Sequence, residues 1–134
     1  MNTIKKLVKV VAAIIENTDK EILCALRSPK MILPNTWEFP GGKVEANEDL
    51  KSAIKREIKE ELNCTIEVSE IFNDIIHEYD TFIINLICMN CSIKEGVATA
   101  SEHSKLIWLK RENLSSLNWA PADIPAVKQL IKNI

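Results

Sequence analysis

The sequence predicts a single α/β domain spanning residues 1–134. Two helix-like segments lie among several strand-like ones, and the composition is 46% apolar and 27% charged, as in ordinary globular proteins. A chain of 134 residues is near the commonest size of one domain and buries enough surface to fold without disulfides or a structural metal. We find neither an internal repeat nor a low-complexity stretch that would divide the chain.

Two β-rich segments separated by a turn open the predicted domain. Valine and isoleucine dominate residues 6–15, and residues 21–26 have a similar composition. Because residues 17–20 are typical of a turn, the two segments are predicted to form a hairpin. Residues 27–36 are predicted to be a loop, and residues 37–39 a short extended piece.

A pair of glycines follows this extended piece. Only three glycines occur in the chain, and two of them are adjacent, Gly41 and Gly42. Glycine is used where the backbone needs unusual dihedral angles or must approach another group closely. The pair therefore predicts one of these two situations directly after Pro40.

The rest of the chain is predicted to contain two helices and three strands. A helix is expected over residues 47–63, and a second one over residues 122–131 with Pro125 in its first turn. The strands are expected at residues 65–79, 81–91 and 105–109.

The helix predicted at residues 47–63 places acidic residues among its apolar ones. At about 100° per residue, one apolar stripe is formed by Leu50, Ala53, Ile54, Ile58 and Leu62. Glu57 and Glu61 fall inside this stripe and Glu60 lies at its edge, whereas three lysines lie on the opposite side. Buried carboxylates are costly and repel one another. We therefore expect the three glutamates to bind a hard divalent cation, Mg²⁺ or Mn²⁺, together with a phosphoester or pyrophosphate substrate.

Two alternatives remain open for this helix. The glutamates could instead pair with nearby lysines on an exposed rim, as in many Glu-rich helices. Arg56 could be a surface residue or could orient one of the glutamates.

The pattern of Gly42, Glu48 and the segment Arg56-Glu57-Ile58-Lys59-Glu60-Glu61 resembles the Nudix box. The match departs only at Asn63, where the family has glycine, and Asn also tolerates a left-handed backbone. Residues 37–43 and 119–125 resemble the corresponding segments of MutT-type members. The resemblance implies the Nudix fold, an α/β/α sandwich around a mixed β-sheet.

The resemblance also implies roles for individual residues. Metal ligands would be Glu57, Glu60 and Glu61 with the backbone carbonyl of Gly41, and Glu102 would bind metal or act as the base. The expected catalytic residues are Glu57, Glu60, Glu61, Glu102 and Arg56. The expected substrate-binding residues are Arg27, Glu38, Phe39, Lys43 and Asp123, with Arg27 on the phosphates and Phe39 and Asp123 in the base pocket.

The implied activity is Mg²⁺-dependent hydrolysis of a nucleoside triphosphate to a monophosphate and pyrophosphate, which for 8-oxo-dGTP would sanitise the nucleotide pool. MutT has asparagine where this chain has Asp123, so a CTP or 5-methyl-dCTP pyrophosphohydrolase is an alternative. A non-catalytic nucleotide-binding module and a coenzyme or nucleotide-sugar hydrolase of the same fold are further alternatives. Between Glu61 and Glu102 the sequence does not choose the base.

Composition excludes several other classes of protein. The net charge of −2 argues against binding to a nucleic-acid polymer, and no apolar run reaches the roughly 18 residues of a membrane span. Without an export signal, the four cysteines predict a reducing cytoplasm and ordinary packed thiols, Cys88-Met89-Asn90-Cys91 included.

Four other side chains keep simple or open interpretations. His77 is expected on a strand surface and His103 in a loop. Trp37 and Trp119 either line a base-stacking pocket or pack beneath loops. The oligomeric state cannot be read from the sequence.

Overall fold

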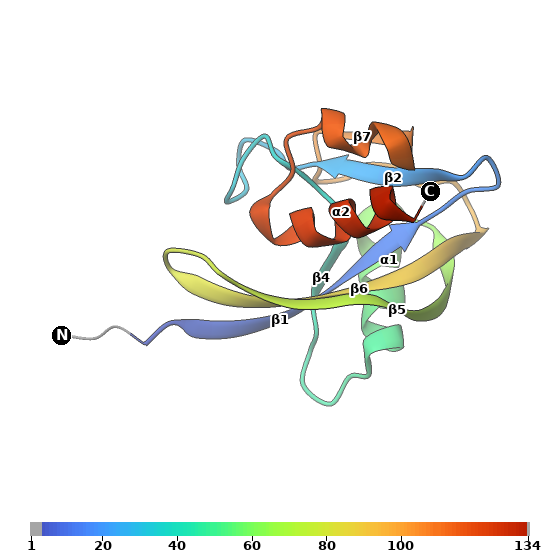
Figure 1. The fold of residues 1–134 in the computed structure, drawn as a ribbon. Coiled ribbons are helices and arrows are strands. Elements are labelled where there is room, and N and C mark those ends of the chain that lie inside the picture. The colour runs from blue at the N-terminus through green and yellow to red at the C-terminus, as the bar shows by residue number, and fades with distance from the viewer. Residues whose placement is uncertain (1–3, 134) are drawn as a thin grey trace.

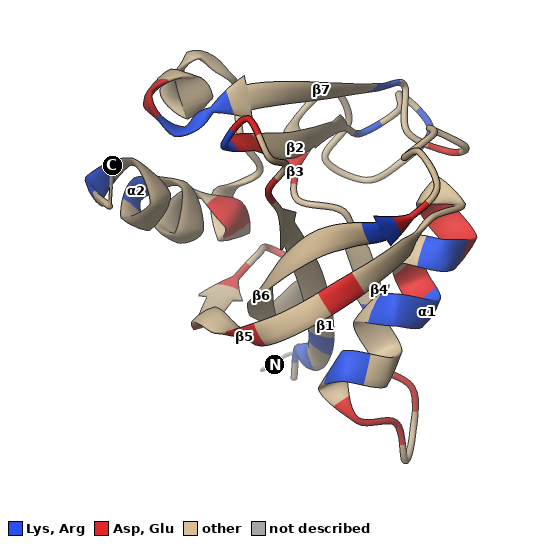
Figure 2. Ribbon diagram, turned by 90° about the vertical axis from the view of Figure 1, so that its right-hand side faces the viewer, with Lys and Arg blue, Asp and Glu red and all other residues tan. Residues whose placement is uncertain are grey.

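The computed structural model describes residues 4–133 and has two β-sheets between two α-helices (Figures 1 and 2). A four-stranded sheet has the order β4–β1–β6–β5 and is mixed, because β1 and β6 run parallel while the other pairs run antiparallel. A three-stranded antiparallel sheet has the order β3–β2–β7. Of the predicted domain, residues 1–3 and 134 lie outside the described residues.

The predicted elements occur in the predicted order, and strand β4 and two 3₁₀ turns, which were not predicted, occur in addition. The strands are β1 (Lys6–Ile15), β2 (Glu21–Leu26), β3 (Trp37–Glu38), β4 (Gly41–Lys43), β5 (Thr65–Glu78), β6 (Phe82–Glu95) and β7 (Lys105–Lys110). The helices are α1 (Leu50–Leu62) and α2 (Ile124–Lys132), with 3₁₀ turns η1 (Arg111–Ser116) and η2 (Pro121–Asp123).

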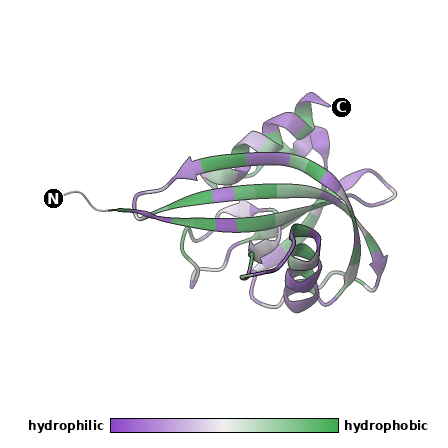
Figure 3. Ribbon diagram, turned by 90° about the horizontal axis from the view of Figure 1, so that it is seen from below, coloured by the Kyte–Doolittle hydropathy of each residue, from purple (hydrophilic) through white to green (hydrophobic). Residues whose placement is uncertain are grey.

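Strand β1 is covered on both faces, which confirms the expected α/β/α arrangement. Val11 and Ala13 pack in a core cluster with Ile54 and Ile58 of α1. Ala12 and Ile14, which alternate with Val11 and Ala13 along β1, belong to a second cluster that contains Leu130 of α2. Because successive side chains of a strand point to opposite faces, one strand serves both cores. The middle parts of the long strands are accordingly largely hydrophobic (Figure 3).

The predicted hairpin of residues 6–26 is wrong beyond its turn. The backbones of β1 and β2 pair only near the turn, where the amide of Asn17 donates to the carbonyl of Glu21 at 3.0 Å. Beyond it, β1 pairs with β6 over its whole length and with β4 at residues 10–12, and β2 pairs with β3 and β7. Pairing on both sides of β1 sends β2 into the second sheet. A local turn signal could not reveal this long-range competition.

Helix α1 begins later than predicted, at Leu50. Asp49 is its N-cap, since its Oδ1 accepts from the amide of Ser52 at 2.8 Å, and Asn47 has a positive φ of 65°. The helix ends at Asn63 with a φ of 54°, so asparagine adopts the left-handed cap conformation expected of it. Strand β6 is longer than predicted and ends at Glu95 instead of residue 91.

The four cysteines are free and buried, as expected of packed thiols. Burial raises the pKa of Cys24 and of Cys91 to about 12, so both thiols are neutral near pH 7. Between residues 4 and 133, the structure contains no helix long and apolar enough to cross a membrane.

Candidate active site

Helix α1 turns two of its three predicted site glutamates toward the protein. The side chains of Glu57 and Glu61 are 16% and 17% exposed, whereas that of Glu60 is 61% exposed. The lysines of the opposite side are exposed, as predicted. The acids are therefore partly covered on the inner side of the helix, with Glu60 at the solvent boundary, as the helical periodicity indicated.

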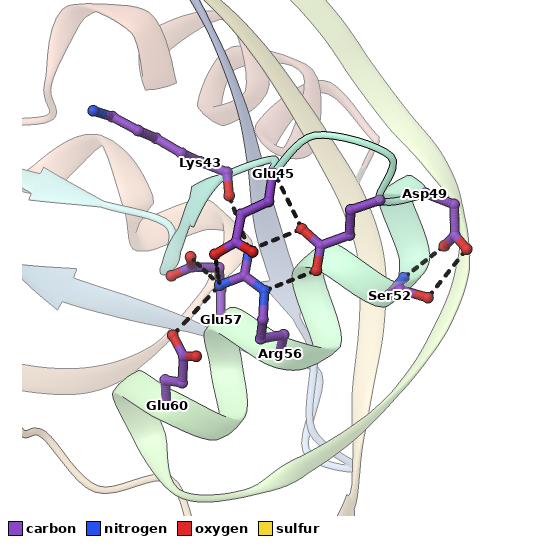
Figure 4. Close-up of polar contacts among 8 residues, drawn as sticks. Lys43, Glu45, Asp49, Ser52, Arg56, Glu57 and Glu60 are labelled. Atoms are coloured by element: carbon purple, nitrogen blue, oxygen red, sulfur yellow. Dashed lines mark hydrogen bonds and ion pairs between the residues drawn. The ribbon is translucent and has the colours of Figure 1, made fainter.

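Arg56 joins helix α1 to the loop that precedes it (Figure 4). Its Nε and Nη2 donate to the two carboxylate oxygens of Glu48 at 2.8 and 2.9 Å, and Nη2 also donates to the carbonyl of Lys43 at 3.0 Å. Its Nη1 donates to Oε1 of Glu57 at 2.7 Å and lies 3.4 Å from Oε2 of Glu60. Arg56 thus orients glutamates, which was one of its two predicted roles.

The guanidinium controls the ionisation of its neighbours. Hydrogen bonds from Arg56, then from the amide of Glu45, lower the pKa of Glu48 to about 2. The hydrogen bonds to Glu48 and Glu57 raise the pKa of Arg56 further above its ordinary value. Glu48 and Arg56 are therefore both charged at every physiological pH, and together they clamp the start of the helix to strand β4.

The two adjacent glycines provide close approach and not unusual dihedral angles. A Cβ atom at Gly42 would clash with the Glu57 carboxylate, and one at Gly41 would clash with the carbonyl oxygen of Val11. Neither glycine has a positive φ, in contrast to Gly96 with a φ of 87°. Gly42 thus makes the space in which the Glu57 carboxylate lies against β4.

Glu61 lies in surroundings opposite to those of Glu48. Burial, and next the negative charges of Glu38, Glu57 and Glu102, raise its pKa to about 8. Its buried Oε2 has no hydrogen-bond partner among the described residues. A buried acceptor without a partner is costly, so this atom is available for a ligand that brings positive charge or a proton.

The segment before β7 is fastened to the end of helix α1. The amide of Thr99 donates to the carbonyl of Leu62 at 3.0 Å, and Oγ of Ser101 donates to the carbonyl of Glu61 at 2.8 Å. This brings Glu102, whose side chain is exposed, close enough to raise the pKa of Glu61. His103 was expected as an ordinary loop residue, but it is buried and lies between Glu38 and Glu61.

The residues present fit a divalent cation, although their side chains do not yet surround one. Within the described part of the chain, no three His, Cys, Asp or Glu side chains form a group that could hold a metal ion as they stand. Glu57 is turned to Arg56 instead. The free Oε2 of Glu61 and the neighbouring carboxylates supply only oxygen atoms, the ligands that hard divalent ions prefer.

A cleft of about 340 Å³ lies beside this acidic cluster. All five predicted substrate-binding residues line it, namely Arg27, Glu38, Phe39, Lys43 and Asp123. Gly41 and Gly42 line it too. Its walls are mainly apolar and include Val10, Tyr79, Phe82, Ile84 and Leu86. The cleft and the acids of α1 therefore meet at strand β4. A larger groove of about 850 Å³, lined by residues such as Glu16 and Arg111, contains none of the predicted site residues.

One end of the cleft carries a buried acid. Oδ2 of Asp123 accepts from the amide of Phe39 at 2.9 Å, and burial raises the pKa of Asp123 to about 8. The hydroxyl of Tyr79 accepts from the amide of Ala122 at 3.0 Å and so holds the turn that carries Asp123. Sequence patterns did not indicate Tyr79, because only the tertiary fold brings the end of β5 to η2.

Two of the predicted substrate-binding residues, Arg27 and Glu38, are paired with each other. Nη1 of Arg27 lies 2.7 Å from Oε1 of Glu38, and its Nε donates to the carbonyl of Ile32 at 2.7 Å. Neither Trp37 nor Trp119 lines the cleft, so they do not form a base-stacking pocket there. Both pack in the second core cluster, where the ring of Trp119 contacts that of Phe39 with centroids 4.8 Å apart.

Known proteins are similar to this chain in sequence and fold. The family model described as NUDIX domain matches residues 11–129. A CTP pyrophosphohydrolase of Escherichia coli K12 is 38% identical over 123 residues, or 92% of this chain and 90% of that protein. An 8-oxo-dGTP diphosphatase of Haemophilus influenzae is 29% identical over 127 residues, or 95% of this chain and 93% of that protein.

Solved structures agree with the sequence comparison. The solution structure of a DNA mismatch repair protein MutT from methicillin-resistant Staphylococcus aureus 252, a Nudix hydrolase, is 47% identical with a TM-score of 0.79. It covers 98% of this chain and 100% of that one. Nudix hydrolases generally use a divalent metal ion. The chain therefore belongs to the Nudix family and is a MutT-like hydrolase.

Proposed function

We propose that this protein hydrolyses a nucleoside triphosphate to a nucleoside monophosphate and pyrophosphate, with Mg²⁺ as its metal ion and Mn²⁺ as a substitute. The observation that carries the proposal is the junction at Gly41 and Gly42, where an apolar cleft meets the acidic face of helix α1. An apolar pocket fits a nucleobase, and adjacent carboxylates fit a metal-bound phosphate chain. The substrate is a small molecule, and we place the protein in the cytoplasm.

Each predicted residue has a part in this proposal. Glu57, Glu60, Glu61 and Glu102, with the carbonyl of Gly41, would hold the ion, which would supply the positive charge that polarises the phosphates and makes a water molecule more acidic. Arg27 and Lys43 neutralise the phosphate chain, since both line the cleft. Arg56 keeps the Glu57 carboxylate in place. Glu61 or Glu102 takes the proton of the attacking water, and the raised pKa of Glu61 suits that role.

Which nucleobase the cleft binds depends on the protonation of Asp123. A carboxylate has two acceptors and pairs with the N–H groups of guanine, including that of 8-oxo-dGTP. A neutral carboxyl has one donor and one acceptor, which matches N3 and the amino group of cytosine. With a pKa of about 8, Asp123 is mostly neutral at pH 7, and this supports a cytosine nucleotide.

Two nucleobases therefore remain candidates, 8-oxoguanine and cytosine. The sequence placed 8-oxo-dGTP first, and the resemblance to an 8-oxo-dGTP diphosphatase supports that choice. The buried Asp123 and the 38% identity to a CTP pyrophosphohydrolase, against 29% to the 8-oxo-dGTP diphosphatase, support CTP or 5-methyl-dCTP, which we now place first. Either substrate gives pyrophosphate and its own nucleoside monophosphate.

The test is a panel of 8-oxo-dGTP, dGTP, CTP and 5-methyl-dCTP with release of pyrophosphate as the readout. We expect turnover with Mg²⁺ that EDTA abolishes, and the highest kcat/KM for a cytosine nucleotide. A higher kcat/KM for 8-oxo-dGTP would restore the first order of bases. Binding of nucleotides without any release of pyrophosphate would favour the non-catalytic module, and turnover of coenzymes or nucleotide sugars alone would favour the other hydrolases.

A further inference from the structure

Four side chains form a continuous polar chain from the nucleotide cleft to helix α1. Arg27 pairs with Oε1 of Glu38 at 2.7 Å, and Oε2 of Glu38 lies 2.8 Å from Nε2 of His103. Nδ1 of His103 lies 3.8 Å from Oε1 of Glu61. The four residues come from the end of β2, from β3, from the segment before β7 and from α1.

His103 is the most deeply buried member of this chain. Its side chain is 1% exposed, against 17–19% for the other three. One ring nitrogen is satisfied by Glu38, but Nδ1 has no partner within residues 4–133, and neither has Oε2 of Glu61. Two buried polar atoms without partners on facing side chains are costly unless the two side chains interact or a ligand joins them.

The remaining gap between the two side chains is small. A hydrogen bond between an imidazole nitrogen and a carboxylate oxygen is about 2.8 Å long, so a shift of about 1 Å closes the 3.8 Å separation of Nδ1 and Oε1. One hydrogen atom, on Nδ1 of His103 or on Oε1 of Glu61, is enough to form this hydrogen bond. The negative charges of Glu57 and Glu102 also act on Glu61 and raise its pKa, and a carboxylate has no hydrogen atom to donate.

We propose that His103 is a positioning residue for Glu61, held through Nε2 by Glu38 and contacting Oε1 of Glu61 through Nδ1. This leaves Oε2 of Glu61 directed to the metal ion or the attacking water, so the proposal rests on the proposed function. The same chain connects the phosphate side of the cleft to the acid. Binding of the phosphate chain at Arg27 thus bears, through Glu38 and His103, on the orientation of Glu61.

Two amide substitutions separate the two ring contacts. The amide nitrogen of glutamine reaches the position of Nε2, and that of asparagine the position of Nδ1, so His103→Gln keeps the contact to Glu38 and His103→Asn keeps the one to Glu61. The readouts are Mn²⁺ affinity measured by electron paramagnetic resonance without nucleotide, kcat and KM measured separately, and Tm. For H103Q we expect roughly 10- to 100-fold losses in kcat and Mn²⁺ affinity, with KM little changed.

His103→Asn is expected to retain more Mn²⁺ affinity than His103→Ala. The proposal is overturned if folded H103Q stays within about twofold of the wild type in both Mn²⁺ affinity and kcat. It is also overturned if activity and affinity fall only in step with Tm, which is the behaviour of a structural residue. If H103Q does not fold, equal Mn²⁺ affinities of H103N and H103A overturn it instead.

A failure of the proposed function gives a different pattern. In that case the wild type itself releases no pyrophosphate with any nucleotide. The Mn²⁺ affinities of H103Q and H103N still report on the contact between His103 and Glu61.

Discussion

Two acids near helix α1, Glu48 in the loop before it and Glu61 on its inner side, have similar exposed fractions and opposite electrostatics. Their side chains are 16% and 17% exposed. Glu48 is covered by the guanidinium of Arg56, which lowers its pKa to about 2. Glu61 is covered by the protein interior and faces other acids, which raise its pKa to about 8. The guanidinium beside Glu48 keeps that carboxylate ionised at pH 7, whereas burial without a neighbouring cation, and next the nearby acids, keep Glu61 mostly neutral.

This difference divides the acidic segment of residues 48–61 into two parts. The part around Arg56 is already satisfied by its own hydrogen bonds and fixes the loop, β4 and Glu57 in place. The part around Glu61 lacks a compensating charge and has a buried oxygen without a partner. A fold keeps such an unsatisfied acid at a functional site, where a ligand supplies what the protein does not.

The largest effect is expected from removing the charge of Glu61. Glu61→Gln should lower kcat by about 10³-fold, because the side chain can neither take a proton nor bind the ion as a carboxylate. At pH 8 without metal, its Tm should equal or exceed that of the wild type by up to about 5 °C, because the amide is neutral where the acid is forced to ionise. Pyrophosphate release and thermal unfolding measure the two effects.

A matched control is available on strand β5. Glu70 is exposed and lies in the groove that contains no predicted site residue, so Glu70→Gln should leave turnover unchanged. Near-normal kcat of Glu61→Gln would contradict the assignment of Glu61 to the site.

The next largest effect is expected at the glycine that accommodates Glu57. Gly42→Ala places a methyl group where the Glu57 carboxylate lies, so the carboxylate must leave Arg56 and β4. We expect kcat to fall about 10- to 100-fold, as for other residues that orient ligands. Gly96→Ala, at a φ of 87°, is the contrasting variant: it should lower stability by about 1 kcal/mol and leave kcat unchanged. Equal activities of the two variants would refute the role of Gly42.

Replacing Arg56 by lysine should weaken the clamp without removing its charge. A single ammonium group cannot supply the fork that contacts both oxygens of Glu48, the carbonyl of Lys43 and Glu57. We expect Arg56→Lys to lower kcat about tenfold and to lower Tm, with Lys55→Arg on the exposed side of the helix as the control. An unchanged Tm would show that the clamp does not stabilise the fold.

The sequence predicted those features that depend on local patterns. Helical periodicity placed Glu57 and Glu61 on the inner side of α1, and the Nudix-box resemblance gathered residues that the structure brings to one cleft and one helix. Local sequence patterns could not reveal that β1 and β2 separate into two sheets, because the pairing of β1 with β6 joins residues far apart in the chain. For the same reason they missed His103, whose partner Glu38 is 65 residues away and whose burial depends on how two sheets meet.

The smallest expected effect is the pH dependence of stability without metal. Glu48 has a lowered pKa when folded, so its stabilisation is present above its unfolded pKa of about 4.5 and is lost as the pH falls toward 2. Glu61 and Asp123 have raised pKa values, so the folded state loses stability as the pH rises from about 4 to 8, where the unfolded chain ionises first. Stability should therefore be greatest near pH 4, and Tm should fall by several degrees toward pH 8.

Divalent metal and substitution should change only the alkaline side of this profile. Mn²⁺ binds the ionised form of Glu61, so it should raise Tm more at pH 8 than at pH 5. The double variant Glu61→Gln with Asp123→Asn should flatten the decline above pH 4 while leaving the acid side intact, since the pair of Glu48 and Arg56 is unchanged. Thermal unfolding from pH 3 to 9 measures both sides. A double variant with an unaltered alkaline decline would mean that other groups cause it, and that the contrast between Glu48 and Glu61 does not govern the pH dependence of folding.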